Sequence, residues 1–313
     1  MDNKTLKYIE LEAHRLATKS GEILSSYFPD FRDRDTSRLE IEYKDRSLRD
    51  PVTQADKAVQ DFLKYEIQKT FPDHGIVSEE EEASDEKSPD VVWVLDPLDG
   101  TRNFMYGFPV YATSIGVLDK GIPVAGAVFI PWPNSTNNGR VIHASRNNGL
   151  SVDGKSLSIK LTDQVDANSI ITLPGSFSKR YEFDNKFISK SGELRMGGSI
   201  AYEIIMVALG ISQYAMISSA YLWDIVGAVS ILIEAGGSPY RLSNSGKFSK
   251  TKGDWEPFVL LLESWTSGVT TLKDMRSRTF PMIVAPSSIV DEVNENIHLK
   301  NQSISQYVKS LFI

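Results

Sequence analysis

The chain has 313 residues, with 34 Lys and Arg against 41 Asp and Glu, a net charge of -7 and no Cys. This acidic balance argues against nucleic acid as a partner, because binding to a phosphate backbone needs a concentrated basic surface. The lack of Cys excludes disulfides, thiolate catalysis and Cys-ligated metals, so any metal site must use oxygen or imidazole ligands.

No export or membrane segment stands out in the sequence. Residues 1–20 mix charged and apolar positions and lack the continuous apolar core of a signal peptide. The longest apolar runs, 204–209 and 225–233, are far shorter than the roughly 20 residues of a membrane span. We therefore expect a cytoplasmic protein with no membrane contact.

In chain order, the first half is predicted to contain two helices followed by strands. Apolar residues at helical spacing predict a helix from Leu6 to Tyr27, and Pro29 stops the pattern. A second helix is predicted over 53–70, after a charge-dense stretch at 30–51 that we expect to be solvated. Short apolar runs bounded by Gly and Pro then predict strands at 91–95, 112–118, 124–130 and 141–144.

The second half alternates between strands and helices. Strands are predicted at 169–173 and 213–217, helices at 202–208 and 225–235, and a terminal helix or two within 286–313. Such alternation suggests an α/β unit. Because the chain is long enough for two domains, we predict an α+β domain over 1–150 and an α/β domain over 151–313.

The segment Asp96-Pro97-Leu98-Asp99-Gly100-Thr101 follows a predicted buried strand. Pro97 would stiffen the turn and Gly100 would permit a backbone conformation that other residues resist, so both carboxylates can face one cleft. A hydrogen-bonded turn explains the same residues.

Three further acidic residues are ambiguous when they are taken singly. Asp224 precedes an apolar helix and Asp56 begins one, so each suits a helix cap. Glu79 opens a run of four Glu, which is usually a solvated face.

Taken together, these residues belong to strings that resemble the signatures of the inositol monophosphatase family over roughly residues 5–290. The strings are Glu79-Glu80, Asp96 to Thr101 with Asn103-Phe104, Phe108-Pro109 with Ser114-Ile115-Gly116, Arg195 to Ala201, and Trp223-Asp224-Ile225 with Glu234-Ala235-Gly236-Gly237. Their order and spacing also match. The resemblance implies an α+β fold in a layered αβαβα sandwich, a homodimer, and a magnesium-dependent phosphomonoesterase that acts by direct attack of a metal-activated water.

The resemblance also assigns roles to residues. The implied metal ligands, for two or three Mg²⁺ with Mn²⁺ as the alternative, are Glu79, Asp96, the carbonyl of Leu98, Asp99 and Asp224. The implied catalytic residues are Asp56, Thr101 and Glu79. The implied contacts to a small phosphorylated substrate are Gly100, Thr101, Arg195, Gly198 and Ser199.

The chemistry of the acidic residues agrees with this resemblance. Two carboxylates about 4 Å apart repel by roughly 4 kcal/mol at an effective dielectric near 20, so such a cluster must shift its pKa values or bind cations. Oxygen ligands without thiolates or paired imidazoles favour magnesium or manganese over zinc. Two such ions can activate a water and stabilise a leaving oxygen.

One position departs from the family pattern. Family members that bind inositol carry a Glu seven residues before the metal-binding Asp of the last motif, and this chain has Ile217 there. An aliphatic side chain accepts no hydrogen bond from a hydroxyl. Inositol monophosphate or a related polyol phosphate therefore competes as substrate with fructose 1,6-bisphosphate, histidinol phosphate and nucleotide 3'-phosphates.

Several alternatives stay open. Arg195 can pair with structural carboxylates instead of substrate. In the sequence, Lys44 falls near the position of a Lys in the family's mobile loop. Residues 253–280 fit the family pattern poorly, and the tail beyond about 295 looks added. A haloacid-dehalogenase phosphatase is disfavoured because its catalytic pair is spaced D-x-D, whereas Asp96 and Asp99 are spaced D-x-x-D. A non-catalytic binding or regulatory protein of the same fold is disfavoured because all of the acidic residues are present.

Overall fold

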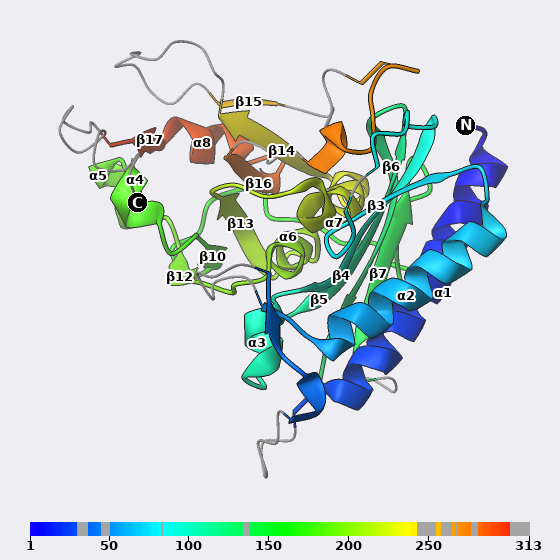
Figure 1. Ribbon diagram of the computed structural model, residues 1–313. Helices are drawn as coiled ribbons and strands as arrows, with labels where there is room; N and C mark the ends of the chain where they lie inside the picture. The colour runs from blue at the N-terminus through cyan, green and yellow to red at the C-terminus, as the bar shows by residue number, and fades with distance from the viewer. Residues whose placement is uncertain are drawn as a thin grey trace.

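The computed structural model describes residues 1–29, 37–44, 51–82, 84–133, 138–242, 255–257, 265–266, 268–276 and 281–300. Within these ranges the chain builds two large sheets and three groups of helices (Figure 1). The helices are α1 Asn3–Tyr27, α2 Gln54–Thr70, α3 Thr101–Met105, α4 Phe177–Arg180, α5 Asn185–Ile188, α6 Ile200–Ala208, α7 Leu222–Glu234 and α8 Val290–Glu295.

The first sheet has seven strands in the order β3-β4-β5-β6-β7-β8-β9. Its strands are β3 Gly75–Ser78, β4 Val91–Asp99, β5 Ala112–Asp119, β6 Ile122–Ile130, β7 Arg140–Ser145, β8 Leu150–Val152 and β9 Lys155–Ser156. Strands β3 and β4 are parallel, and every other pair in this sheet is antiparallel.

The second sheet has six strands in the order β12-β10-β13-β16-β14-β15. Its strands are β10 Ile170–Thr172, β12 Glu193–Arg195, β13 Ser212–Ile217, β14 Gly237–Leu242, β15 Trp255–Pro257 and β16 Met282–Pro286. The pairs β10·β12 and β10·β13 are parallel and the others antiparallel, so the sheet is mixed. Two small ribbons pair β1 Glu42–Tyr43 with β2 Pro51–Val52, and β11 Tyr181–Phe183 with β17 Ile297–Leu299.

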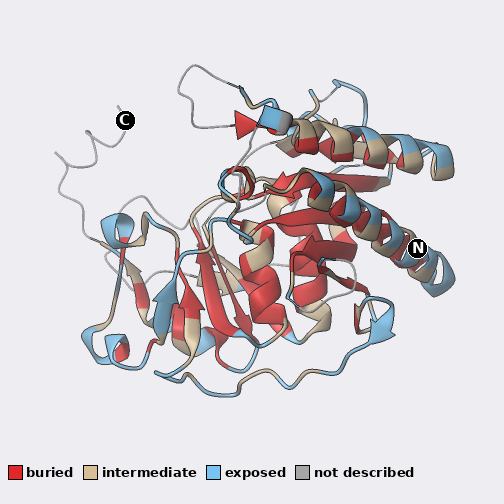
Figure 2. Cartoon of the chain, turned by 90° about the horizontal axis from the view of Figure 1, so that it is seen from below, coloured by how far each residue is buried: buried red, intermediate tan, exposed pale blue. Residues whose placement is uncertain are grey.

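Three apolar clusters hold these elements in five layers. One joins α1 and α2 to the outer face of the first sheet, and a second joins both sheets to α6 and α7 between them. The third packs the far face of the second sheet against α5 and α8. Figure 2 shows the sheets and the central helices mostly buried and the outer helices partly exposed. The layered αβαβα sandwich of an α+β protein is therefore confirmed.

Most predicted elements lie within a few residues of their expected places, but the C-terminal region differs. The terminal helix or two expected within 286–313 is observed as one short helix, α8, followed by strand β17. Residues 301–313 lie outside the described part of the chain. Of 253–280, Trp255–Pro257 adds an edge strand and Asp274–Arg276 forms a 3-10 turn. The division at residue 150 stays a prediction.

Helix α7 lies unusually close to the first sheet because three glycines meet at their contact. A Cβ on Gly126 of β6 would lie 2.1 Å from the carbonyl oxygen of Gly227 in α7. A Cβ on Gly116 of β5 would lie 2.6 Å from the Gly227 nitrogen. This contact lets the first turn of α7 approach the strands. No described helix is both long and apolar enough to cross a membrane.

We expect Gly126→Ala to lower the free energy of unfolding by about 1–3 kcal/mol, because the new methyl group must push two backbones apart. Urea denaturation measures the change. The matched control is Gly175→Ala, where the nearest atom to a Cβ is the Met196 sulfur at 3.7 Å. Equal midpoints for the two variants would contradict the close contact.

Candidate active site

The two aspartates of the Asp96 segment are brought to one side of β4 by a β-bulge. Asp96 pairs with Ser114 and Asp99 with Ala112, so three steps along β4 match two along β5. In a regular strand, residues three apart point to opposite faces. One extra residue reverses that alternation. The two carboxylates accordingly lie near enough to repel each other.

Gly100 turns the chain sharply after this bulge. It has a φ of +87°, in the left-handed region that favours glycine, and it precedes helix α3. A Cβ here would lie 3.0 Å from the Val110 carbonyl oxygen and 3.1 Å from the Ser199 Cβ. Any other residue would therefore separate the segment from residue 199. The sequence predicted this glycine's conformational role.

Two further carboxylates reach the cluster from other elements. Glu79 directly follows β3, and its backbone nitrogen donates to the Leu95 carbonyl at 3.2 Å, which places it beside the end of β4. Asp224 lies in the first turn of α7, where one oxygen accepts a hydrogen bond from the Tyr221 nitrogen at 2.7 Å. The structure thus brings together residues from β4, from α7 and from the position just after β3.

Burial and mutual repulsion dominate the electrostatics of this cluster. Burial raises the pKa of Asp96 well above its ordinary value, and the charges of Glu79, Asp99 and Asp224 raise it further. Burial and the charge of Asp99 likewise raise the pKa of Asp224, against the opposing hydrogen bond from Tyr221.

Asp99 has a pKa of about 6, because burial outweighs the hydrogen bonds that it accepts. Its Oδ2 accepts from the Ser199 hydroxyl at 2.7 Å and from the Ala201 nitrogen at 2.6 Å. These bonds tie the end of β4 to the start of α6. A cluster of acids held in this way favours either protons or added positive charge.

Lys44 supplies one positive charge at the edge of the cluster. Its ammonium donates to Glu79 Oε1 and Glu80 Oε1, each at 2.8 Å. Burial alone would lower the pKa of Lys44, but the two carboxylates outweigh burial and raise it. Among the described residues, no three His, Asp or Glu side chains are arranged to enclose a cation as they stand.

Asp56 and Thr101 lie side by side, and the charges of Glu79 and Glu80 act on Asp56. The Thr101 hydroxyl is 3.0 Å from the Leu98 carbonyl and 3.4 Å from Asp56 Oδ1. The other oxygen of Asp56 accepts from the Thr53 nitrogen at 2.8 Å and so caps α2. Burial raises the pKa of Asp56 to about 7, against the Thr53 hydrogen bonds. Asp56 is therefore a helix cap that also faces Thr101.

The residues expected to contact substrate fall into two groups. Gly198 and Ser199 lie beside Asp99, and Gly198 has a φ of +81°. Arg195 lies in strand β12 with its guanidinium exposed, and it forms an ion pair with Glu193 at 3.0 Å. Of the two alternatives that the sequence left open for Arg195, the structure shows the pairing with a carboxylate.

Arg276 is a site residue that sequence reasoning missed. Its guanidinium donates to the Ser78 carbonyl and, at 3.1 Å, to the Glu79 carbonyl. It also lies 4.8 Å from the centre of the Trp223 ring, which precedes Asp224. One side chain therefore connects the backbone of Glu79 to the start of α7. No local pattern in the sequence marks it, because all of its partners are distant in the chain.

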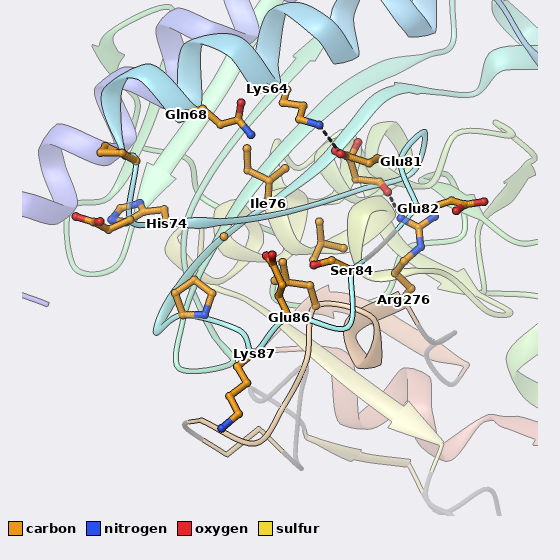
Figure 3. A pocket seen from close by; sticks show the side chains of 17 residues that line it. Lys64, Gln68, His74, Ile76, Glu81, Glu82, Ser84, Glu86, Lys87 and Arg276 are labelled. Atoms are coloured by element: carbon orange, nitrogen blue, oxygen red, sulfur yellow. Dashed lines mark hydrogen bonds and ion pairs between the residues drawn. The ribbon is translucent and has the colours of Figure 1, made fainter.

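A pocket of about 370 Å³ lies on the other side of Arg276, along β3 (Figure 3). Figure 3 shows Lys64 directed toward Glu81, with which it forms an ion pair, and Arg276 beside Glu82. None of the candidate metal ligands or catalytic residues lines this pocket. It is separate from the acidic cluster.

This chain is similar to known proteins over most of its length. The sequence profile described as the inositol monophosphatase family matches residues 6–269. A match to Phosphatase IMPL1, chloroplastic, of Arabidopsis thaliana is 36% identical over 67% of this chain and 57% of that protein. A match to the fructose-1,6-bisphosphatase/inositol-1-monophosphatase of Aquifex aeolicus is 30% identical over 74% of this chain and 84% of that protein.

The fold is also that of solved structures. The suppressor protein SuhB of Bartonella henselae superimposes with a TM-score of 0.65 at 22% identity, over 90% of this chain and 94% of the other. The family match and the relatives named above make this a protein of a phosphatase family. The chain belongs to the inositol monophosphatase family.

The raised pKa of Asp99 predicts how the stability of the metal-free protein depends on pH. The unfolded carboxyl ionises near 3.8 and the folded one near 6, so the contribution of Asp99 to stability falls as pH rises from about 4 to about 6. Asp99→Asn removes this titration. We expect the free energy of unfolding of the variant to increase relative to that of the wild type across this pH window. At pH values above the window the difference should be on the order of 3 kcal/mol.

Urea denaturation with a chelator at several pH values measures this difference. Asp61→Asn, a change at an exposed position on α2, is the control. A constant difference between Asp99→Asn and the wild type from pH 4 to pH 7 would contradict the prediction.

Arg276→Met keeps an apolar stem near Trp223 but removes both hydrogen-bond donors. We expect the free energy of unfolding to fall by about 1–3 kcal/mol, because the Ser78 and Glu79 carbonyls lose their charged partner. Thermal and urea denaturation measure the loss. Arg195→Met, which removes an exposed guanidinium, is the matched control; if it costs as much, the specific role of Arg276 is wrong.

Proposed function

We propose that the protein is a magnesium-dependent phosphomonoesterase that hydrolyses a small phosphorylated metabolite by direct attack of water. The observation that carries this proposal is the convergence of Asp96, Asp99 and Asp224, whose pKa values are raised, with Glu79, whose charge acts on all three. Family membership supports phosphatase chemistry. Magnesium as the particular cation and the homodimer are predictions that rest on the resemblance, and the cytoplasmic location is a prediction from the sequence pattern.

The donor set fits hard divalent cations. Every candidate ligand offers oxygen, and the cluster of mutually repelling carboxylates gains most from compact positive charge. Glu79, Asp96, the Leu98 carbonyl, Asp99 and Asp224 are the residues that would hold two or three ions, with Mn²⁺ as the alternative to Mg²⁺. When bound, such ions would supply the positive charge that activates water and stabilises the leaving oxygen.

The chain's own groups would prepare the water. The Thr101 hydroxyl can donate its proton to Asp56 or to the Leu98 carbonyl, which leaves its lone pairs to accept from a water. Asp56 is itself held by the Thr53 nitrogen, so its free oxygen keeps one direction toward Thr101. This relay orients the nucleophile without moving the backbone.

The phosphate would lie at the turn after β4. Gly100 and Thr101 bring backbone amides there, and Ser199 lies against Asp99. A cation that binds Glu79 would have to displace the Lys44 ammonium, because the ammonium donates a hydrogen bond to the same carboxylate.

Asp99→Asn tests the proposal. We expect at least about a 100-fold fall in magnesium-dependent release of phosphate, because one ligand charge is lost from the cluster. The variant should also lose the rise in melting temperature that magnesium gives the wild type by binding only the folded state. Phosphate release and thermal melts with and without magnesium measure both effects.

Asp61→Asn, on the exposed face of α2, is the control and should keep both properties. Activity of Asp99→Asn equal to that of the wild type would refute the assignment of the site.

A further inference from the structure

A pocket of about 370 Å³ opens directly beside the acidic cluster. Ser199 belongs to both, because it lines the pocket while its hydroxyl donates to Asp99 at 2.7 Å. A phosphate ester bound at the cluster would therefore extend its alcohol part into this pocket. The side chains of the pocket decide which alcohol fits.

Apolar side chains supply most of the pocket wall. Leu173 and Pro174 follow β10, Met216 and Ile217 end β13, and Met196 and Ile200 flank the loop before α6. Ile217 is only 3% exposed and pairs in register with Met282, so its place at the end of β13 is fixed by the sheet. Met196 is 65% exposed and forms the open lip.

Among the residues that line the pocket, Glu203 has the one carboxylate, and one of its oxygens is bonded to the pocket's own wall. Glu203 Oε1 accepts hydrogen bonds from the Gly197 nitrogen at 2.8 Å and the Gly198 nitrogen at 3.0 Å. Asn103 holds the same loop from outside by donating to the Gly197 carbonyl at 2.9 Å. Glu203 therefore shapes the loop that bears Ser199. Ser218 and Ser219 are the other polar side chains here besides Ser199.

The small number of polar side chains in the pocket matters for a ligand whose ring carries many hydroxyls. Each hydroxyl moved from water into the pocket needs a hydrogen-bond partner, and an unpaired one weakens binding. An apolar ring of the same size instead gains from burial against Leu173, Met196 and Ile217.

We propose that this pocket selects the phosphate monoester of a largely apolar alcohol over that of a polyol. The inference rests on the proposed function, since it concerns the alcohol side of the same site. The selecting residues are Ile217 at the buried end of the pocket and Met196 at its lip.

Cyclohexyl phosphate and inositol 1-phosphate test this selection, because they share one six-membered ring and differ in its hydroxyls. We expect kcat/KM with magnesium to be about tenfold or more higher for cyclohexyl phosphate, the usual size of an apolar pocket's discrimination. Cyclohexanol is the poorer leaving group of the two, so intrinsic reactivity works against the expected result. Methyl phosphate, which barely enters the pocket, reports the chemistry itself.

Variants at the two selecting residues should weaken the preference. Ile217→Gln adds a hydrogen-bond acceptor and should move the ratio toward inositol 1-phosphate by about tenfold, whereas Ile217→Leu should keep it. Met196→Ser, at an exposed position outside the core, should lower the ratio about threefold without affecting folding. A loss of structure in Ile217→Gln, seen by thermal melting, leaves Met196→Ser to test the pocket.

The outcomes separate the two proposals. Hydrolysis of methyl phosphate with equal or better use of inositol 1-phosphate overturns the selection alone. So does hydrolysis of methyl phosphate with neither ring ester accepted. Failure to hydrolyse any of the three esters with magnesium overturns the phosphatase proposal itself.

Discussion

Repulsion among buried carboxylates is the constraint on which the rest of this structure depends. Burial raises the pKa values of Asp96, Asp99 and Asp224, and a chain free to relax would move these carboxylates apart. The fold prevents this by placing them on a bulged strand and a packed helix. Stability is thus given up locally at the point where chemistry needs concentrated negative charge.

The supports of the cluster come from ordinary packing. Gly126 and Gly227 let α7 lie against the sheet, and the buried sandwich around them leaves little room for α7 to withdraw. On the other side, Ser199 and the Ala201 nitrogen hold Asp99 from α6. The two central helices therefore hold the same set of charges from two directions.

The sequence predicted what local patterns encode. The helix ending near Tyr27 follows from apolar spacing and Pro29, and the acidic residues follow from strings with family-specific order. The sequence could not predict features that depend on how strands pair or on contacts between residues distant in the chain. The bulge at Asp96 and Asp99 exists only against β5, whose register is a property of the folded sheet. Arg276 contacts Ser78, which lies 198 residues earlier in the chain, and Trp223 only in the folded protein.

The ion pair of Lys44 with Glu79 has a consequence for any cation that binds the cluster. Because the ammonium and the cation would share one carboxylate, their binding free energies are coupled, and each weakens the other by the same factor. The short segment Ser37–Lys44 is thereby linked to the charge state of a site that it does not otherwise build. The Lys44 ammonium acts as an internal counterion for Glu79 when no cation occupies the cluster.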